Sequence, residues 1–341
     1  GVYSRSVGGN VTITTNNIGA DSSDRSYTGI DEAITGTASG ALSVTSLGTV
    51  YATQTGISAV NNNLGGIIVN LNSGSTLDVT GGVATVGEYV RDTGSAGGIT
   101  VNNQAGSVID PATAVDSQIV NNANSGNVVV HQNGTATGTD VGVIAATNGT
   151  GNVTVDGSGA VTGGAGAGAF ALTTTPSSAP VTASNAGIVA IQNGTSGGVT
   201  VGGSGTTSGT GAITAEITNA ANGSAVLVNR SGAISVTGTD GFGVDAVTLG
   251  TGTVTVMNTG TIAGASGGTV VSGINASAQG GNVLVQNVGG ITATGTDGTG
   301  ITASTINSVT GTGGGSCAST ANGKALSSTT TVNVNVTLAN D

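Results

Sequence analysis

Short segments of alternating apolar and polar residues recur along the chain at nearly regular intervals. An alternation with a period of two is typical of a β-strand that buries one face. The intervals between these segments are mostly 25 to 32 residues, which suits one coil of a solenoid. The first apolar residues of the segments are Val11, Leu42, Ile67, Ile99, Val128, Val153, Val199, Val226, Val254 and Val283.

Toward the C-terminal end the repeat becomes more regular. Asn229, Asn258 and Asn287 are spaced 29 residues apart, and each follows an alternating segment. Two further short strands follow each of them, as at 261–263 and 273–276. Three strands in each period predict an all-β, right-handed parallel β-helix of about eleven three-strand coils. In such a fold each strand pairs with the equivalent strand one coil above and below.

The composition supports strands and argues against helices. The chain has 64 glycines and 6% charged residues, and no segment shows an apolar stripe with a helical period. Aromatic residues make up 2%, as expected for a narrow interior filled by Val, Ile, Leu and Ala. Because a solenoid lengthens without a new core, we expect one continuous domain over 1–341. Irregular insertions are predicted around 165–185 and around 311–328. In the first, Pro176 and Pro180 predict a loop that protrudes from one coil.

The charge and the scarcity of reactive residues narrow the function. A net charge of −11 with five basic residues cannot form the cationic surface that nucleic acid requires. No apolar run approaches the roughly 20 residues of a spanning helix, so we expect no membrane insertion of this segment. The acidic residues are scattered and His131 is the only histidine. We therefore expect no catalytic residue, no cofactor and no metal.

Two alternatives to this view remain open. A polysaccharide-acting β-helix enzyme is the less favoured one, because it would need carboxylates clustered on one face. Calcium binding at the turns 238–241 and 295–298, which both read Gly-Thr-Asp-Gly, is the other. Asp240 and Asp297 are 57 residues apart, or two coils, so one ion could not bind both. The simpler interpretation is that Asp and Gly tolerate the dihedral angles of tight turns.

Large and charged side chains concentrate in the first 92 residues. All four tyrosines and three of the five basic residues lie there, and the densest group is 88–92. Exposed tyrosine beside arginine suits contact with a sugar or a protein. We take Tyr3, Tyr89, Arg91 and Asp92 as candidate recognition residues, with ordinary solvent-exposed side chains as the alternative.

Asparagines at the ends of the first strands suggest a structural role. Asn103, Asn258 and Asn287 occupy this position, where their amides could stack from coil to coil. We predict that they form an inter-coil ladder.

Two phrases resemble a known class of proteins. Residues 1–9, GVYSRSVGG, resemble the G-[VI]-[YFL]-[AS]-x-S-x-G-G phrase of giant autotransporter-type surface proteins. Residues 258–262, NTGTI, are similar to the N-x-G-x-I phrase of autotransporter passengers and filamentous-haemagglutinin-like adhesins. The resemblance implies secretion across the outer membrane of a Gram-negative bacterium and a location at the cell surface.

We therefore expect an extracellular structural or adhesive rod that is not an enzyme. Its partner would be a host or bacterial surface protein or a glycan. The alternative is a self-assembling fibre subunit, joined head to tail through uncapped β-helix ends, whose partners are copies of itself.

Overall fold

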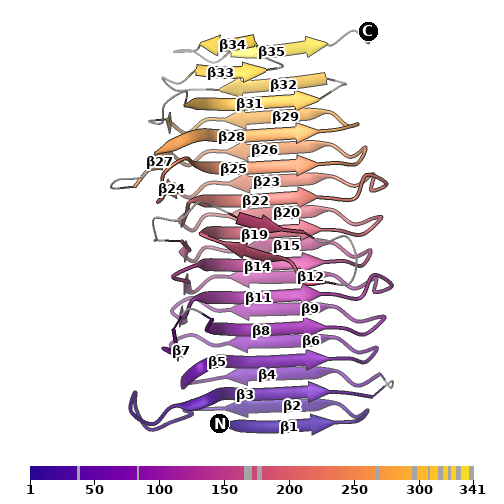
Figure 1. Cartoon of the computed structure of the whole chain (residues 1–341), viewed down its shortest axis with the longest axis vertical. Helices are drawn as coiled ribbons and strands as arrows, with labels where there is room; N and C mark the ends of the chain where they lie inside the picture. The colour runs from indigo at the N-terminus through magenta and orange to yellow at the C-terminus, as the bar shows by residue number, and fades with distance from the viewer. Residues whose placement is uncertain are drawn as a thin grey trace.

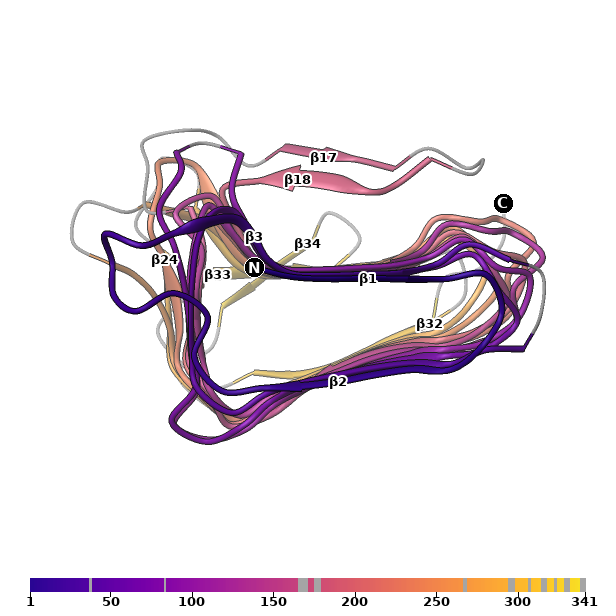
Figure 2. The ribbon, with the colours of Figure 1, turned by 90° about the horizontal axis from the view of Figure 1, so that it is seen from below.

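The computed structural model shows an all-β chain wound into a parallel β-helix of about ten coils (Figure 1). The structure describes residues 1–36, 39–82, 84–164, 171–174, 179–265, 269–293 and 298–305, and the backbone alone of 308–313, 318–321, 324–327 and 332–337. Seen from the N-terminal end, the chain runs clockwise from β1 (Val2–Ser6) to β2 (Val11–Thr15) as it recedes from the viewer (Figure 2). The helix is therefore right-handed, as predicted.

Each coil contributes strands to three parallel stacks, which form two long sides and one short side of the cross-section (Figure 2). The β1 stack continues with β3 (Ser26–Ile34), β5 (Thr49–Asn61), β8 (Val86–Asp92), β11 (Thr113–Ile119), β14 (Val141–Thr147), β19 (Ala186–Gln192), β22 (Gly211–Ile217), β25 (Gly241–Thr248), β28 (Val270–Ala278), β31 (Thr299–Thr305) and β33 (Ala318–Ala321). The β2 stack continues with β4 (Leu42–Ser46), β6 (Ile67–Leu71), β9 (Ile99–Asn103), β12 (Val128–Gln132), β15 (Val153–Asp156), β20 (Val199–Gly203), β23 (Val226–Arg230), β26 (Val254–Asn258), β29 (Val283–Asn287) and β32 (Ser308–Gly313). The β7 stack on the short side contains β7 (Thr76–Val79), β10 (Val108–Asp110), β13 (Thr135–Thr137), β16 (Val161–Thr162), β21 (Thr207–Gly209), β24 (Ile234–Val236), β27 (Ile262–Gly264) and β30 (Ile291–Thr292).

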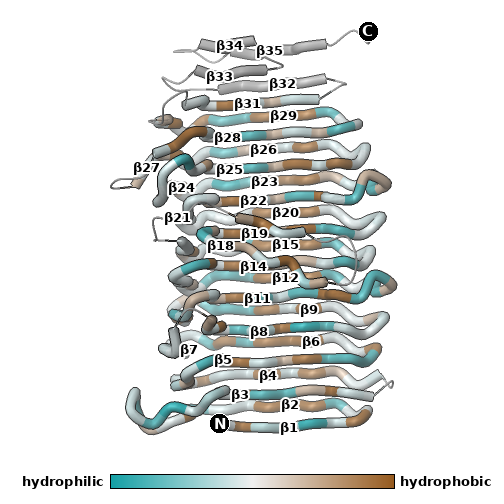
Figure 3. Tube along the Cα trace, viewed as in Figure 1, coloured by the Kyte–Doolittle hydropathy of each residue, from teal (hydrophilic) through white to brown (hydrophobic). Residues whose placement is uncertain are grey.

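The core is built from columns of equivalent residues in successive coils. The ten apolar residues that mark the repeat in the sequence begin the strands of the β2 stack from β2 to β29, and all of them are buried. The alternation of polar and apolar residues along the strands is visible in Figure 3. One inward column of the β1 stack is mostly alanine, which leaves room for the larger Val and Ile columns to interdigitate. Its alanines are Ala59, Ala145, Ala190, Ala215, Ala246, Ala276 and Ala303.

At Gly142, where the β7 and β1 stacks meet, neighbouring atoms leave no room for a Cβ atom. A Cβ atom at Gly142 would lie 2.5 Å from Cγ1 of Val161 and 2.6 Å from the carbonyl oxygen of Gly187 in the next coil. We expect Gly142→Ala to lower the free energy of unfolding by about 2 kcal/mol, since the clash is with backbone. Glycine to alanine changes at unstrained, open positions usually stabilise instead. Gly290→Ala is the control, because a Cβ there meets nothing within 4 Å. Equal effects of the two changes in chemical denaturation would contradict the prediction.

The insertion predicted around 165–185 contains a packed hairpin where the sequence predicted a loop. β17 (Ala171–Thr173) and β18 (Thr182–Ser184) pair antiparallel and lie outside the β1 stack (Figure 2). The amide of Gln118 donates to the carbonyl oxygen of Val181 at 2.9 Å and accepts from its N–H at 2.8 Å. Beneath the insertion is an apolar cluster on the outer side of the stack. Its buried members are Val141, Ile144, Ala146, Val181, Ala186, Val189 and Ile191.

Parallel stacking gives way to antiparallel pairing in the last strands. β35 (Val332–Thr337) pairs antiparallel with β32, and β34 (Lys324–Ser327) pairs antiparallel with β33. The insertion expected around 311–328 overlaps these strands, and its residues 314–317, 322–323 and 328 lie outside the described residues. Nowhere in the described part of the chain is there a helix long and apolar enough to cross a membrane.

Candidate recognition face

The outward side of the β1 stack gathers tyrosine, arginine and aspartate side chains from successive coils. We call this side the outer face and its two outward rows the first and second outer columns. The first outer column contains Tyr3, Asp31, Ser58, Tyr89, Asp116, Ile144, Val189, Thr214, Asp245, Asn275 and Thr302. The second outer column contains Arg5, Ala33, Val60, Arg91, Gln118, Ala146, Ile191, Glu216, Val247, Ser277 and Ser304.

In the first coil, Arg5 joins an exposed tyrosine to an aspartate of the next coil. Its guanidinium carbon lies 4.2 Å from the centroid of the Tyr3 ring. Its Nη2 donates to Oδ2 of Asp31 at 2.8 Å. Tyr3 is 69% exposed. An aromatic ring, a cation and an anion are thus presented together on the solvent side.

The same arrangement recurs further along the stack. Arg91 lies 4.7 Å from the centroid of the Tyr89 ring, and its Nη2 donates to Oδ2 of Asp116 at 2.9 Å. Tyr89 is half-buried, but Arg91 is only 6% exposed. Burial raises the pKa of Asp116, and the Arg91 guanidinium opposes that rise. Arg91 therefore holds Tyr89 and Asp116 in place and does not offer its own charge to solvent.

A third arginine makes a related contact at the edge of the β7 stack. Arg25 donates through Nη2 to both carboxylate oxygens of Asp78 at 3.0 Å. Its guanidinium carbon lies 5.5 Å from the centroid of the Tyr51 ring. In every one of these three groups the arginine bridges different coils and stacks on a tyrosine.

Asp92 does not belong to the surface patch. Strand alternation turns its side chain inward, and the residue is completely buried. Its Oδ1 accepts from the N–H of Gly94 at 2.8 Å, and its Oδ2 accepts from Nδ2 of Asn124 at 3.4 Å. Burial raises the pKa of Asp92 to about 7. The acid thus fixes the turn that follows β8. The prediction of Asp92 as a recognition residue is therefore wrong, because residues alternate between the two faces of β8 and Asp92 lies on the inward one.

The inward ladder of amides exists in part. Nδ2 of Asn258 donates to Oδ1 of Asn287 at 2.7 Å, which is the coil-to-coil contact expected of these two residues. Nδ2 of Asn103 likewise donates to an amide of the next coil, at Oε1 of Gln132 (2.8 Å), and it also donates to Oε2 of Glu88 at 2.9 Å. The column position below Asn258 is occupied by Arg230.

The regular spacing of Asn229 with Asn258 and Asn287 is therefore misleading. Asn229 pairs with Met257 in register and is exposed, one residue out of phase with the inward column. Besides Asp92, three charged residues lie inside the helix and were not anticipated there, namely Glu32, Glu88 and Arg230. The signal that could have found them is the register itself, because all three occupy positions at which neighbouring coils have inward residues.

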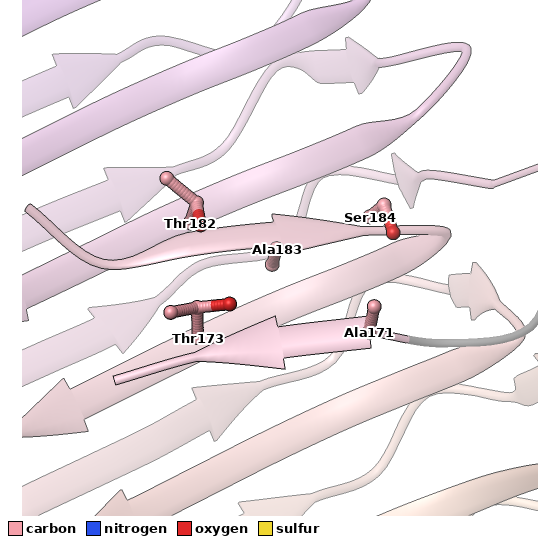
Figure 4. A pocket seen from close by; sticks show the side chains of 5 residues that line it. All are labelled: Ala171, Thr173, Thr182, Ala183 and Ser184. Carbon is pink, nitrogen blue, oxygen red and sulfur yellow. The ribbon is translucent and has the colours of Figure 1, made fainter. Parts of the chain in front are cut away.

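Among the described residues, no three His, Cys, Asp or Glu side chains are grouped so as to hold a metal ion. His131 pairs with Asp156 at 2.5 Å on the outer side of the β2 stack. Asp240 has a φ of 59°, in agreement with a turn residue chosen for its backbone, whereas Asp297 lies outside the described residues. One open pocket on the hairpin is lined by small side chains, namely Ala171, Thr173, Thr182, Ala183 and Ser184 (Figure 4).

No protein-family model, curated protein or solved structure matches this sequence. We therefore infer function from the geometry of the chain itself.

Proposed function

We propose that the chain is a non-catalytic, extracellular rod of a bacterial surface adhesin. Its outer face near β1 and β8 contacts a protein or a glycan on a host or bacterial cell. The observation that carries the proposal is the repeated Tyr–Arg–Asp arrangement on one side of a long β-helix with an apolar interior. Coil-to-coil backbone pairing gives such a rod length and stiffness.

The spacing of the two tyrosines suits an extended ligand. Tyr3 and Tyr89 stand in one column, three strands apart, which corresponds to roughly 14 Å. An extended peptide of about four residues would span this distance, as would a short oligosaccharide. The stacked arginines restrict the tyrosine rings, so less side-chain entropy is lost on binding.

Adhesion of coated beads tests the proposal. We expect beads carrying the purified chain to adhere to fixed epithelial cells, and the double change Tyr3→Ala and Tyr89→Ala to reduce adherence about tenfold. The control is the double change Thr12→Ala and Thr14→Ala on the outward side of the β2 stack, which should adhere like the wild type. If the tyrosine double variant adhered as well as the threonine double variant, the outer face would not be the contact surface.

Negative-stain electron microscopy separates the rod from the fibre subunit. We expect single particles of one rod each. Among the described residues β1 pairs only with β3, and β2 only with β4, so one edge of each strand has no partner strand. Unbranched filaments would contradict the adhesive rod and support the alternative, a fibre subunit that assembles head to tail through such edges.

A further inference from the structure

Two carboxylates stand on the outer face away from the tyrosines. Asp245 lies in the first outer column on β25, and Glu216 lies in the second outer column on β22, one coil earlier. The register places Thr214 directly beside Asp245, two residues before Glu216. Both acids are half-buried. We call Glu216 and Asp245 the carboxylate pair.

The carboxylate pair occupies a diagonal that holds an ion pair in two other coils. Arg5 in the second outer column reaches Asp31 in the first outer column of the next coil, at 2.8 Å. Arg91 reaches Asp116 across the same diagonal, at 2.9 Å. Side chains at these two positions therefore converge. In the coil of β22 the arginine is replaced by a glutamate, so two negative charges converge where a positive and a negative charge meet elsewhere.

No described cation compensates this charge. The described salt bridges of the chain are made by Arg5, Arg25, Arg91 and His131, and none includes the carboxylate pair. Burial raises the pKa of Glu216 to about 7, and the negative charge of Asp245 adds to the rise. Burial also raises the pKa of Asp245, although Nδ2 of Asn275 donates to its Oδ1 at 2.8 Å.

A neutral oxygen donor lies beside the carboxylate pair. Thr214 takes the column position that Tyr3 and Tyr89 hold in the two arginine groups. It is completely buried, and its Oγ1 has no hydrogen-bond partner. Because strand alternation directs this side chain to the outer face, the hydroxyl lies on the same side as both carboxylates. A buried hydroxyl without a partner is costly, so a ligand that it could bind would be favoured.

We propose that Glu216, Asp245 and the Thr214 hydroxyl bind a divalent metal ion, with Ca²⁺ as the preferred ion. All three groups offer hard oxygen donors. Calcium accepts irregular coordination at about 2.3–2.6 Å and completes it with water, whereas Mg²⁺ demands a nearly ideal octahedron. The ion takes the place that the guanidinium group has in the coils of β1 and β8. The site is separate from the proposed contact with a partner and does not depend on it.

Calorimetric titration of the chelator-treated chain with CaCl₂ tests the site. We expect one ion per chain and a higher melting temperature in calcium. Glu216→Gln keeps the shape but removes one charge, and it should weaken binding at least tenfold. Asp31→Asn is the matched control, since it changes an aspartate of the same column that already has an arginine, and it should bind calcium like the wild type.

A charge reversal at Glu216 distinguishes loss of calcium binding from loss of folding. Glu216→Arg rebuilds the arginine–aspartate diagonal, so we expect it to melt at a higher temperature than the wild type without calcium and to show no response to calcium. Absence of binding by the wild type would overturn the proposal. So would unchanged binding by Glu216→Gln, or loss of binding in Asp240→Asn, which would assign the ion to a turn. The chain could also be stabilised by Glu216→Gln at pH 8 while calcium has no effect on the wild type. That result would show that Glu216 and Asp245 share a proton and do not bind an ion.

Discussion

Glu88→Gln is expected to raise the free energy of unfolding by about 3 kcal/mol at pH 8 and to change it little at pH 4.5. Glu88 lies in an inward column of the β1 stack, between Ile57 and Val115, and is completely buried. Its Oε2 accepts from Nδ2 of Asn103 at 2.9 Å, but its Oε1 has no partner. Burial raises the pKa of Glu88 to about 7, so the folded protein must ionise this group at a cost.

The direction of the pH effect follows from the order of the two pKa values. The pKa of Glu88 in the folded state, about 7, lies above its ordinary value of 4.5. The folded state therefore binds the proton more tightly, and this stabilisation is complete below pH 4.5. It is lost as the pH rises through 7. Burial also raises the pKa of Glu32 and Asp92 to about 7, so the wild-type chain should be more stable at pH 5 than at pH 8.

Chemical denaturation at pH 4.5, 5, 6, 7 and 8 measures this profile. Glu88→Gln should flatten the profile without abolishing it, because Glu32 and Asp92 still titrate. Asp110→Asn, at an exposed carboxyl of β10, is the control and should follow the wild type. A wild-type stability that increases from pH 5 to pH 8 would be incompatible with these interior acids.

The fold could be predicted from sequence because its determinants are local and repeated. The alternation gives the strands, and the interval between strands gives the coil. The start of every β2-stack strand from Val11 to Val283 was predicted for this reason. The hairpin of β17 and β18 could not be predicted, because its contacts join Val181 to Gln118, which is 63 residues away. Nothing in the local pattern indicates that this segment folds back onto the outer face.

The candidate site was predictable only where its contacts lie within one strand. The pairing of Tyr3 with Arg5, and of Tyr89 with Arg91, is a spacing of two residues on one face. Asp116 was missed, since its coil has alanine at position 114 in place of the glycine that marks this strand in most coils. Recognising it requires the register between coils, which depends on packing of the whole column.

Arg230→Ala is expected to lower the free energy of unfolding by about 4 kcal/mol. Arg230 is 2% exposed and points into the helix, where burial lowers its pKa to about 10, so it remains charged at neutral pH. Its guanidinium group donates to the carbonyl oxygens of Gly202 and Gly205, and its Nη2 donates to Oγ1 of Thr207 at 2.8 Å. Alanine would remove these three donated hydrogen bonds and open a cavity.

The column explains why a long cation is placed here. Gly203 lies one coil below Arg230 in register and has no side chain, whereas Asn258 lies one coil above. The arginine therefore fills space left by a glycine and donates to backbone carbonyls one coil below. Arg230→Met keeps most of the volume but no donor, so its loss should be intermediate between wild type and alanine. The neighbouring Asn229→Ala is the control, because Asn229 is exposed and should be almost neutral in chemical denaturation. If Arg230→Ala were as mild as Asn229→Ala, the guanidinium group would not lie inside the helix. The register that aligns Arg230, and not Asn229, with Asn258 would then be wrong.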